Sequence, residues 1–368
     1  MIRFERRLRQ PRWLMVAVPV GSILVAFALM AVVLLATHHP PLHTFSRLLS
    51  SGFGSRQSLN DTLVSATPLV FTGLCAAVAF RMQLFNIGGE GQLYAGALLG
   101  AAAGIALGDH TGWLSVPAMI AAGAAGGAAL ALVPGILRAF FATNEIITSL
   151  MLNYVGALVV NYLIFDSLSY WRDTSSPSAK VFPQGRNLPE AASWPTSHVG
   201  SLVVPFGLLV GVLVATVVWL LYTRTRFGFE VQVIGDSPRA ARYAGMRTRR
   251  KILAVMALSG AIAGIGGASQ DGDFRHSLDA RGLTAAGYGY AGIVIAALAR
   301  YNPFAVCLVA FLLGGLQNAG YTLQGVDFPS GLVGVMQGLI LFSALGGELL
   351  IRYRVRFVRR THAVEAAA

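Results

Sequence analysis

Long apolar runs separated by short polar breaks dominate this chain, and the pattern predicts a bundle of membrane-spanning helices. The first run covers residues 14–36, about 23 residues, which is long enough to cross a bilayer with some tilt. Comparable runs recur to residue 350, and together they predict about ten spans. The runs are 14–36, 62–80, 93–107, 113–136, 146–164, 201–222, 252–268, 286–299, 304–323 and 332–350. The expected fold class is all-α, a polytopic transmembrane helical bundle with one interrupted helix near residues 81–92.

Composition supports this class and argues against others. Hydrophobic residues make up 55% of the 368 residues and charged residues only 12%, whereas a soluble domain carries about 25% charged residues. Cys75 and Cys307 both lie in apolar runs, which argues against a disulfide framework and against a metal site. Glycines at four-residue spacing predict one helix face that packs closely on a neighbour. They are Gly96, Gly100, Gly104 and Gly108.

The distribution of charge predicts the orientation in the membrane. Basic segments beside membrane spans stay on the cytoplasmic side. On this rule residues 1–13, the loop 223–251 and the tail 352–368 are cytoplasmic, and the net charge of +12 needs no nucleic-acid partner. Polar stretches without this basic excess are expected outside: 37–61, 166–200 and 271–281. The whole chain, residues 1–368, is expected to form a single transmembrane domain.

A short capped helix is predicted inside the basic loop 223–251. Ser237 can cap its first turn, Pro238 suits the first helical position, and Gly245 can end it in a left-handed conformation. The helix would present small side chains beside one aromatic ring: Ala240, Ala241, Ala244 and Tyr243. Ala241 and Ala244, three residues apart, are expected on one face that fits a partner's groove. The alternative is a helix that only connects two spans.

The most unusual chemistry lies in residues 85–92, where three glycines and a carboxylate interrupt an apolar region. A carboxylate at the bilayer centre costs about 2.5–3.5 kcal/mol even on lenient scales. Polar, glycine-rich backbone at membrane depth is tolerated only where protein buries it or where it lines an aqueous cavity. Asn86, Glu90 and Gln92 are therefore candidates for lining a translocation path. The alternative is a cytoplasmic turn directly after Arg81, in which Glu90 is solvated.

Three further residues join these candidates for the path. Asn144 and Glu145 precede an apolar run, and Asn153 lies within that run. Because Asn often caps helices and Glu suits a first helical turn, Asn144 and Glu145 also have an ordinary structural explanation. Asn153 needs a buried partner, and it either joins two helices or lines the path.

Three blocks of sequence carry a resemblance to a known family: residues 85–92 (FNIGGEGQ), residues 144–154 and residues 239–245 (RAARYAG). They resemble the permease subunit of ABC importers in the branched-chain amino acid/ribose permease family, and more narrowly its nucleoside and simple-sugar branch. The first block is the specific part, and the resemblance covers most of the chain. It implies a permease of the bacterial inner membrane that moves its solute by alternating access, with residues 86–92 at membrane depth.

The resemblance also implies partners. The short helix in the loop 223–251 would be the coupling helix that docks onto a separate ATP-binding subunit. A second homologous permease subunit and an external solute-binding protein would complete the importer within the lipid bilayer.

The lysines of the chain support this division of labour. A phosphate-binding loop needs Gly-Lys-Ser/Thr, but Lys180 and Lys251, the only lysines, precede valine and isoleucine. No cofactor and no catalytic residue are therefore expected in this chain, and ATP is expected to be used by a partner subunit. The alternative is an ion-coupled secondary transporter or channel. Such proteins hold acidic or His relays inside their spans, and Glu90 is the only strong candidate here.

Overall fold

The computed structural model describes residues 2–6, 12–175, 177–324 and 331–357. They fall within two compact units, one from residues 1–44 with 331–368 and the other from residues 45–330. Residues 1, 7–11 and 358–368 of the predicted cytoplasmic ends lie outside the described residues.

The smaller unit brings the two ends of the described chain together. Helix α1 (Arg12–Ala36) packs along α15 (Leu332–Arg352). Strand β1 (Ile2–Arg6) pairs antiparallel with β4 (Tyr353–Phe357), with Ile2 opposite Phe357. This pairing fits the expectation that both termini lie on one side of a membrane.

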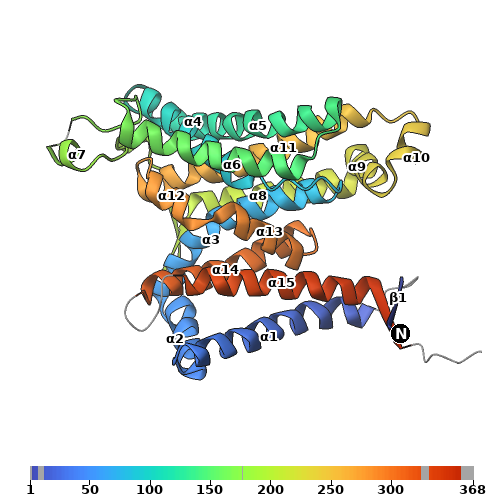
Figure 1. Ribbon diagram of the computed structural model, residues 1–368. Helices are drawn as coiled ribbons and strands as arrows, with labels where there is room; N and C mark the ends of the chain where they lie inside the picture. The colour runs from blue at the N-terminus through green and yellow to red at the C-terminus, as the bar shows by residue number, and fades with distance from the viewer. Residues whose placement is uncertain (1, 7–11, 176, 325–330, 358–368) are drawn as a thin grey trace, which may run out of the picture. The chain divides into compact units, whose positions relative to one another are not determined.

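The larger unit is mostly helical (Figure 1). Its long helices are α3 (Arg56–Phe80), α4 (Gly89–Thr111), α5 (Ser115–Phe141), α6 (Glu145–Asn161), α8 (Phe206–Arg224), α11 (Thr248–Ser269) and α14 (Pro303–Thr322). Shorter helices are α7 (Pro177–Val181), α9 (Arg226–Asp236), α10 (Pro238–Tyr243), α12 (Ala280–Ala286) and α13 (Tyr288–Leu298). Two π-helical segments, η2 (Tyr162–Asp166) and η4 (Gln270–Arg275), continue α6 and α11. The other elements are the 3-10 turns η1 (Gly112–Leu114) and η3 (Glu190–Ala192) and the strands β2 (Thr196–Val199) and β3 (Leu202–Pro205).

Seven stretches of the described chain are long and apolar enough to cross a membrane, or up to eight if α1 and α2 (Pro41–Phe53) form one broken span. The seven are α3, α4, α5, α6 with η2, α8, α11 with η4, and α14. The remaining predicted runs coincide with α13 and α15. With 11 residues, α13 is too short to cross about 30 Å of hydrocarbon alone. The all-α bundle is confirmed, and the count of ten spans remains a prediction.

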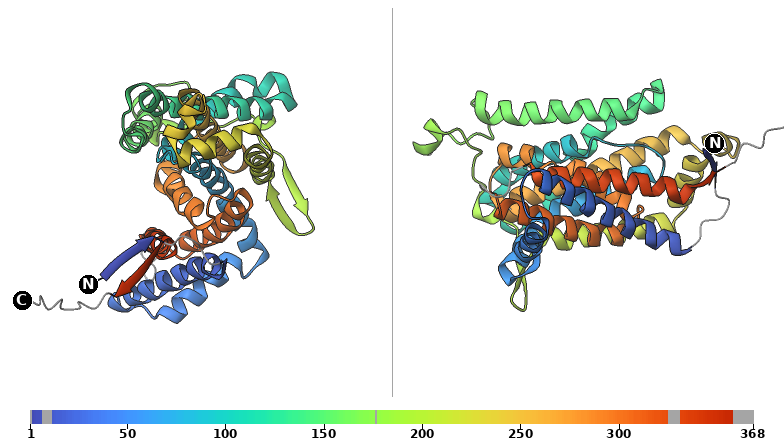
Figure 2. Two further views of the ribbon diagram at one scale, coloured as in Figure 1. Left: turned by 90° about the vertical axis from the view of Figure 1, so that its right-hand side faces the viewer. Right: turned by 60° about the horizontal axis from the view of Figure 1, so that its bottom comes forward.

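Two expected boundaries are wrong. Residues 37–61 are largely helical, because α2 fills 41–53 and α3 begins at Arg56, where Ser55 Oγ accepts the N–H of Ser58 (3.0 Å). Apolar side chains from residue 202 onward predicted a helix there, but residues 202–205 pair with β2 in a hairpin. That hairpin projects from the helices in Figure 2. Helix α8 therefore begins only after Pro205.

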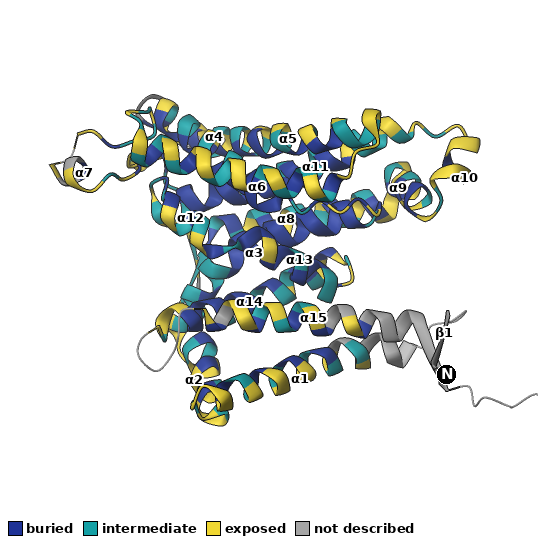
Figure 3. Ribbon diagram, viewed as in Figure 1, coloured by how far each residue is buried: buried dark blue, intermediate teal, exposed yellow. Residues whose placement is uncertain are grey.

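Glycines let α11 approach α4 and α5 closely. A Cβ atom on Gly264 of α11 would lie 2.0 Å from the carbonyl oxygen of Gly123 in α5. A Cβ atom on Gly96 of α4 would lie 2.2 Å from the Cα atom of Gly264. Gly100 likewise faces Ala268. Figure 3 shows the consequence, since much of α11 is buried. The predicted glycine face of residues 96–108 is therefore a packing face.

The two largest polar segments lie at opposite ends of the larger unit. Figure 1 places α7, within residues 166–200, at one end and α10, within the basic loop, at the other. Trp171 holds the first segment on the helices, because its Nε1–H donates to the carbonyl oxygen of Leu98 in α4 (2.8 Å). Placement at opposite ends agrees with segments on opposite sides of a membrane, and the side that each segment faces remains a prediction.

Candidate functional site

The chain between α3 and α4 turns back into the protein. Helix α3 ends at Phe80, and Gln83 takes a left-handed conformation with φ of 56°. The side-chain amide of Asn86 then reaches Sγ of Cys75 (3.8 Å). Cys75 lies five residues before the end of α3, about 8 Å along the helix axis. Helix α4 therefore begins inside the bundle, and the predicted interruption near residues 81–92 consists of the non-helical residues 81–88.

Two side-chain amides close this turn. Asn86 Nδ2 donates to Gln92 Oε1 (3.0 Å), and Gln92 Nε2 donates back to Asn86 Oδ1 (2.9 Å). Asn86 also donates to Oγ of Ser259 in α11 (2.9 Å), which donates to the carbonyl oxygen of Cys75 (2.8 Å). Both amide side chains are about 1% exposed. Because buried polar groups need partners, this network fixes the start of α4 against α3 and α11.

Glu90 joins the beginnings of two helices. Its carboxyl group accepts the hydroxyl of Tyr94 (2.6 Å) and the backbone N–H of Gly289, at the start of α13. Only glycine fits at 289, because a Cβ atom there would lie 2.2 Å from the backbone nitrogen of Glu90. Glu90 is 2% exposed. The alternative in which Glu90 is solvated is therefore wrong, and the depth of the turn in the membrane remains a prediction.

Asn153 holds the turn from the side of α6. Its Oδ1 accepts the N–H of Gly91 (2.9 Å), and its Nδ2 donates to the carbonyl oxygen of Ile87 (2.9 Å). Ser149, one turn earlier, accepts the N–H of Ile87 (3.2 Å). Asn153 thus joins two helices in this conformation and sits in the same buried cluster as Asn86, Glu90 and Gln92.

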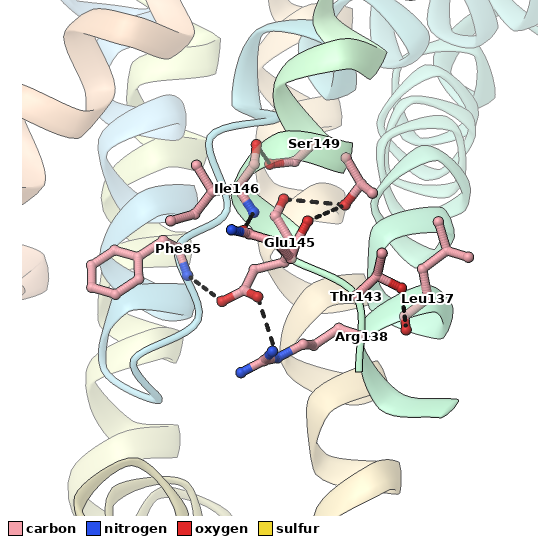
Figure 4. Close-up of polar contacts among 9 residues, drawn as sticks. Phe85, Leu137, Arg138, Thr143, Glu145, Ile146 and Ser149 are labelled. Atoms are coloured by element: carbon pink, nitrogen blue, oxygen red, sulfur yellow. Dashed lines mark hydrogen bonds and ion pairs between the residues drawn. The ribbon is translucent and has the colours of Figure 1, made fainter. Parts of the chain in front are cut away.

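Asn144 and Glu145 lie outside this cluster, at the start of α6. Figure 4 shows the side chain of Glu145 between Phe85 and Arg138. Asn144 is exposed and caps α6, because its Oδ1 accepts the N–H of Ile146 (2.9 Å). Glu145 is buried, pairs with Arg138 of α5 (3.2 Å) and accepts the N–H of Phe85 (3.4 Å). Glu145 therefore anchors the entry to the turn.

Helix α10 begins and ends where the sequence predicts. Ser237 Oγ accepts the N–H of Ala240 (3.3 Å), Pro238 takes the first position, and Gly245 has φ of +75°. The expected docking face differs, because Ala241 is 0% exposed and packs within its own chain. Ala241 and Ala244 therefore do not share an outward face. Of the residues predicted to couple to a partner, the exposed ones are Pro238, Ala240, Tyr243, Ala244 and Gly245, and Arg239 and Arg242 beside them are exposed as well.

Comparison with known proteins decides the family. The family described as branched-chain amino acid transport system / permease component matches residues 58–345. The chain belongs to this permease family. It is therefore a transport subunit and not an enzyme.

Named relatives cover nearly the whole permease. It is 29% identical over 329 residues to the nucleoside ABC transporter permease protein NupB of Lactococcus lactis, covering 89% of this chain and 90% of the relative. It is 31% identical over 346 residues to the guanosine ABC transporter permease protein NupP of Bacillus subtilis, covering 93% of this chain and 94% of the relative. It is 33% identical over 368 residues to the glucose ABC transporter permease protein TsgB13 of Haloferax volcanii, covering 96% of this chain and 93% of the relative.

Two acidic residues of the permease, the buried Asp271 and the half-buried Asp273, are not among the predicted site residues, because residues 271–281 are expected to form an external loop. Asp271 and Asp273 lie in η4, which continues α11. Asp271 is 0% exposed, and no donor from the described part of the chain reaches either carboxyl oxygen. Asp273 accepts the N–H of Gly207 at the start of α8 (2.7 Å). A signal was present, because Gly264, Gly267 and Asp271 follow the helical spacing of the packing face.

The permease also links α10 to the turn by one intervening helix. α9 ends at Asp236, directly before the cap of α10. A Cβ atom on Gly235 would lie 2.9 Å from the carbonyl oxygen of Arg81 and 3.2 Å from the carbonyl carbon of Met82. Arg81 is further placed by its guanidinium, 5.0 Å from the ring centre of Tyr222. The first residues of the turn thus lie against the backbone of α9.

Proposed function

We propose that this permease is the membrane-spanning subunit of an ATP-driven importer for nucleosides or simple sugars. The observation that carries the proposal is the buried polar cluster of Asn86, Glu90, Gln92 and Asn153, built around a helix that begins inside the bundle. Amide groups donate and accept hydrogen bonds, so they match the hydroxyls and ring nitrogens of neutral polar solutes. The names of the relatives, which include nucleoside, guanosine and glucose permeases, support the same classes.

The mechanism we propose is alternating access. In the described conformation the cluster's polar groups bond to one another and to neighbouring backbone. A solute would replace some of these bonds in another conformation, and only bonds that differ between the two states can drive the change. Asn144 and Glu145 would act at the entry to the turn.

ATP would be hydrolysed on a partner subunit that contacts the exposed residues of α10. A second homologous permease subunit would complete the path, and an external solute-binding protein would deliver solute to the end formed by residues 166–200. The protein would lie in the bacterial inner membrane with both termini and α10 in the cytoplasm. The positive charge of residues 223–251 supports this orientation.

Reconstituted uptake tests the proposal. The permease, with its partner subunits, is placed in proteoliposomes with solute-binding protein outside and radiolabelled guanosine or glucose. Uptake should require ATP and should stop with a non-hydrolysable ATP analogue. The alternative, an ion-coupled carrier, is favoured by the buried carboxyls of Glu90 and Asp271. Uptake that follows an imposed proton or sodium gradient without ATP would establish that alternative instead.

A further inference from the structure

A basic groove lies at the end of the larger unit that carries α10. Its volume is about 780 Å³, within the range of ligand pockets, roughly 300–1,000 Å³. One wall comes from α9 and the other comes from the start of α11. Ala244, Gly245 and Met246 close the groove, so its edge adjoins the residues proposed to contact the ATP-binding subunit. The charged residues that line this groove are Arg226, Glu230, Arg247, Arg250 and Lys251, and the exposed ring of Phe229 lies beside them.

The two walls present their charges toward one space. On each wall the residues are three and four positions apart, so they share one helix face. Lys251 Nζ lies 2.7 Å from Glu230 Oε2 and ties the walls together. Arg249, one position from Arg250, lies outside the groove and stacks over Phe140 of α5 at 5.4 Å.

The groove carries a net positive charge. Its four basic residues and one acidic residue leave a net charge of +3. The charge of Glu230 is neutralised by Lys251. The three remaining basic residues are exposed and have no carboxylate partner among the described residues: Arg226, Arg247 and Arg250. The groove also adjoins the N-terminus of α11, a helix of 22 residues, whose dipole favours an anion.

The surroundings of the groove identify the class of anion. Phe227, Met246 and Ala254 add apolar lining, and Ala254 lies within the stretch Thr248–Arg275 that can cross a membrane. Phe229 is 63% exposed. Basic and aromatic side chains at the end of a span are typical of the membrane–water interface, and basic pockets between spanning helices bind lipid head groups. We propose that this groove binds the phosphate head group of an anionic phospholipid, with an acyl chain leaving past Ala254.

An acidic surface of the ATP-binding subunit is the competing occupant. The apolar lining favours the lipid, because it reaches Ala254, within the stretch of α11 that is apolar enough to cross a membrane. Lipid binding at this groove does not depend on which solute is transported. Failure of the uptake experiment would leave the lipid proposal unaffected, and failure of the lipid experiment would leave the proposed import function unaffected.

Native mass spectrometry of the purified full chain tests the proposal. The probe is a detergent-solubilised mixture of phosphatidylglycerol and phosphatidylcholine in equal amounts. The wild-type chain should retain phosphatidylglycerol preferentially, and the double variant Arg247→Gln/Arg250→Gln should lower that preference roughly tenfold, since each basic side chain adds to the attraction for an anionic lipid. The matched control Arg239→Gln/Arg242→Gln removes the same charge from α10 and should behave as wild type.

Each other outcome overturns the proposal. Equal loss in both double variants would show a general effect of charge, and displacement of the lipid by millimolar inorganic phosphate would show a site for free anions. If the groove variant keeps its phosphatidylglycerol but loses the ATP-binding subunit in co-purification, the occupant is that subunit. A thermal unfolding scan of each variant confirms that the compared chains are folded.

Discussion

The carboxyl group of Glu90, in the first turn of α4, accepts the backbone N–H of Gly289, which lies 199 residues further along the chain at the start of α13. The contact joins two helices that both begin inside the larger unit. Helix starts have unpaired N–H groups, and here a side chain from one start satisfies a group of the other. The cluster around Glu90 is thus a structural joint as well as the candidate path.

Glu90→Gln should therefore weaken both stability and uptake. The substitution turns one acceptor oxygen into an NH₂ group that faces a donor, and a buried donor left without its acceptor costs about 1–3 kcal/mol. Thermal unfolding in detergent and solute uptake measure the two effects. Tyr94→Phe is the control, because it removes one donor and leaves the bond to Gly289. Wild-type melting temperature and uptake in Glu90→Gln would contradict this role.

Gly264→Ala should destabilise the bundle strongly. The added methyl group would meet the backbone of Gly123 and of Gly127, which cannot move aside as a side chain can, and overpacking a close contact costs about 1–3 kcal/mol or more. Gly21→Ala in α1 is the matched control, because nothing lies within 4 Å of its added methyl group. Equal melting temperatures for the two variants would show that α11 packs differently.

Asp273→Ala and Asp271→Ala should have different effects on the free energy of unfolding, although the two residues lie only two positions apart. Asp273 caps the start of α8 through Gly207, and loss of such a cap costs about 0.5–2 kcal/mol. Asp271 has no donor to lose among the described residues, and removing an unpaired buried carboxyl relieves its desolvation cost. Denaturant titration should show Asp273→Ala less stable than wild type and Asp271→Ala at least as stable. A loss of stability in Asp271→Ala would reveal a partner.

Tyr243→Ala should weaken association with the ATP-binding subunit without lowering the stability of the permease. Tyr243 is 94% exposed, so its removal should leave the melting temperature unchanged while reducing co-purification of the ATP-binding subunit. Ala241→Trp should instead lower the stability of the permease itself, because position 241 is fully buried. Arg239→Ala should have little effect, since an exposed charge contributes about 0–1 kcal/mol. Unchanged subunit association in Tyr243→Ala would leave α10 as a connector.

Cysteine labelling should place the two ends of the larger unit on opposite sides of the membrane. Thr174, three residues before α7, and Tyr243, the last residue of α10, are both exposed. An impermeant maleimide should modify Thr174→Cys in intact spheroplasts and should reach Tyr243→Cys only after the membrane is opened. The parent chain with Cys75 and Cys307 gives the background. The reverse pattern would invert the proposed orientation and remove α10 from contact with a cytoplasmic ATP-binding subunit.

Much of the structure could be predicted from the chemistry of residues that are close together in the sequence. Polar residues beside glycines could not be exposed to lipid, so the burial of Asn86, Glu90 and Gln92 follows from the cost of polar groups in hydrocarbon. The caps of α6 and α10 depend only on residues near them, and the glycine face of α4 follows from helical spacing. None of these features needs knowledge of a distant neighbour.

Features that depend on distant neighbours could not be predicted. A helix of six residues such as α10 makes fewer than two turns, so nothing in its sequence shows that Ala241 faces inward. Asp271 lies among balanced charges that resemble a solvated loop, and only the continuation of α11 as η4 buries it. The bond from Glu90 to Gly289 requires two helix starts to meet, which no local pattern encodes.

The close approach of Gly235 to Arg81 and Met82 joins α9 directly to the start of the turn. Backbone meets backbone there, and no flexible side chain lies between them to absorb a displacement. A displacement of α10 by a partner would therefore also displace the first residues of the turn. The turn leads within a few residues to the cluster of Asn86, Glu90 and Gln92. A larger side chain at 235 would push the turn away from α9, so the resting position of the turn, and not only its stability, depends on this position being glycine.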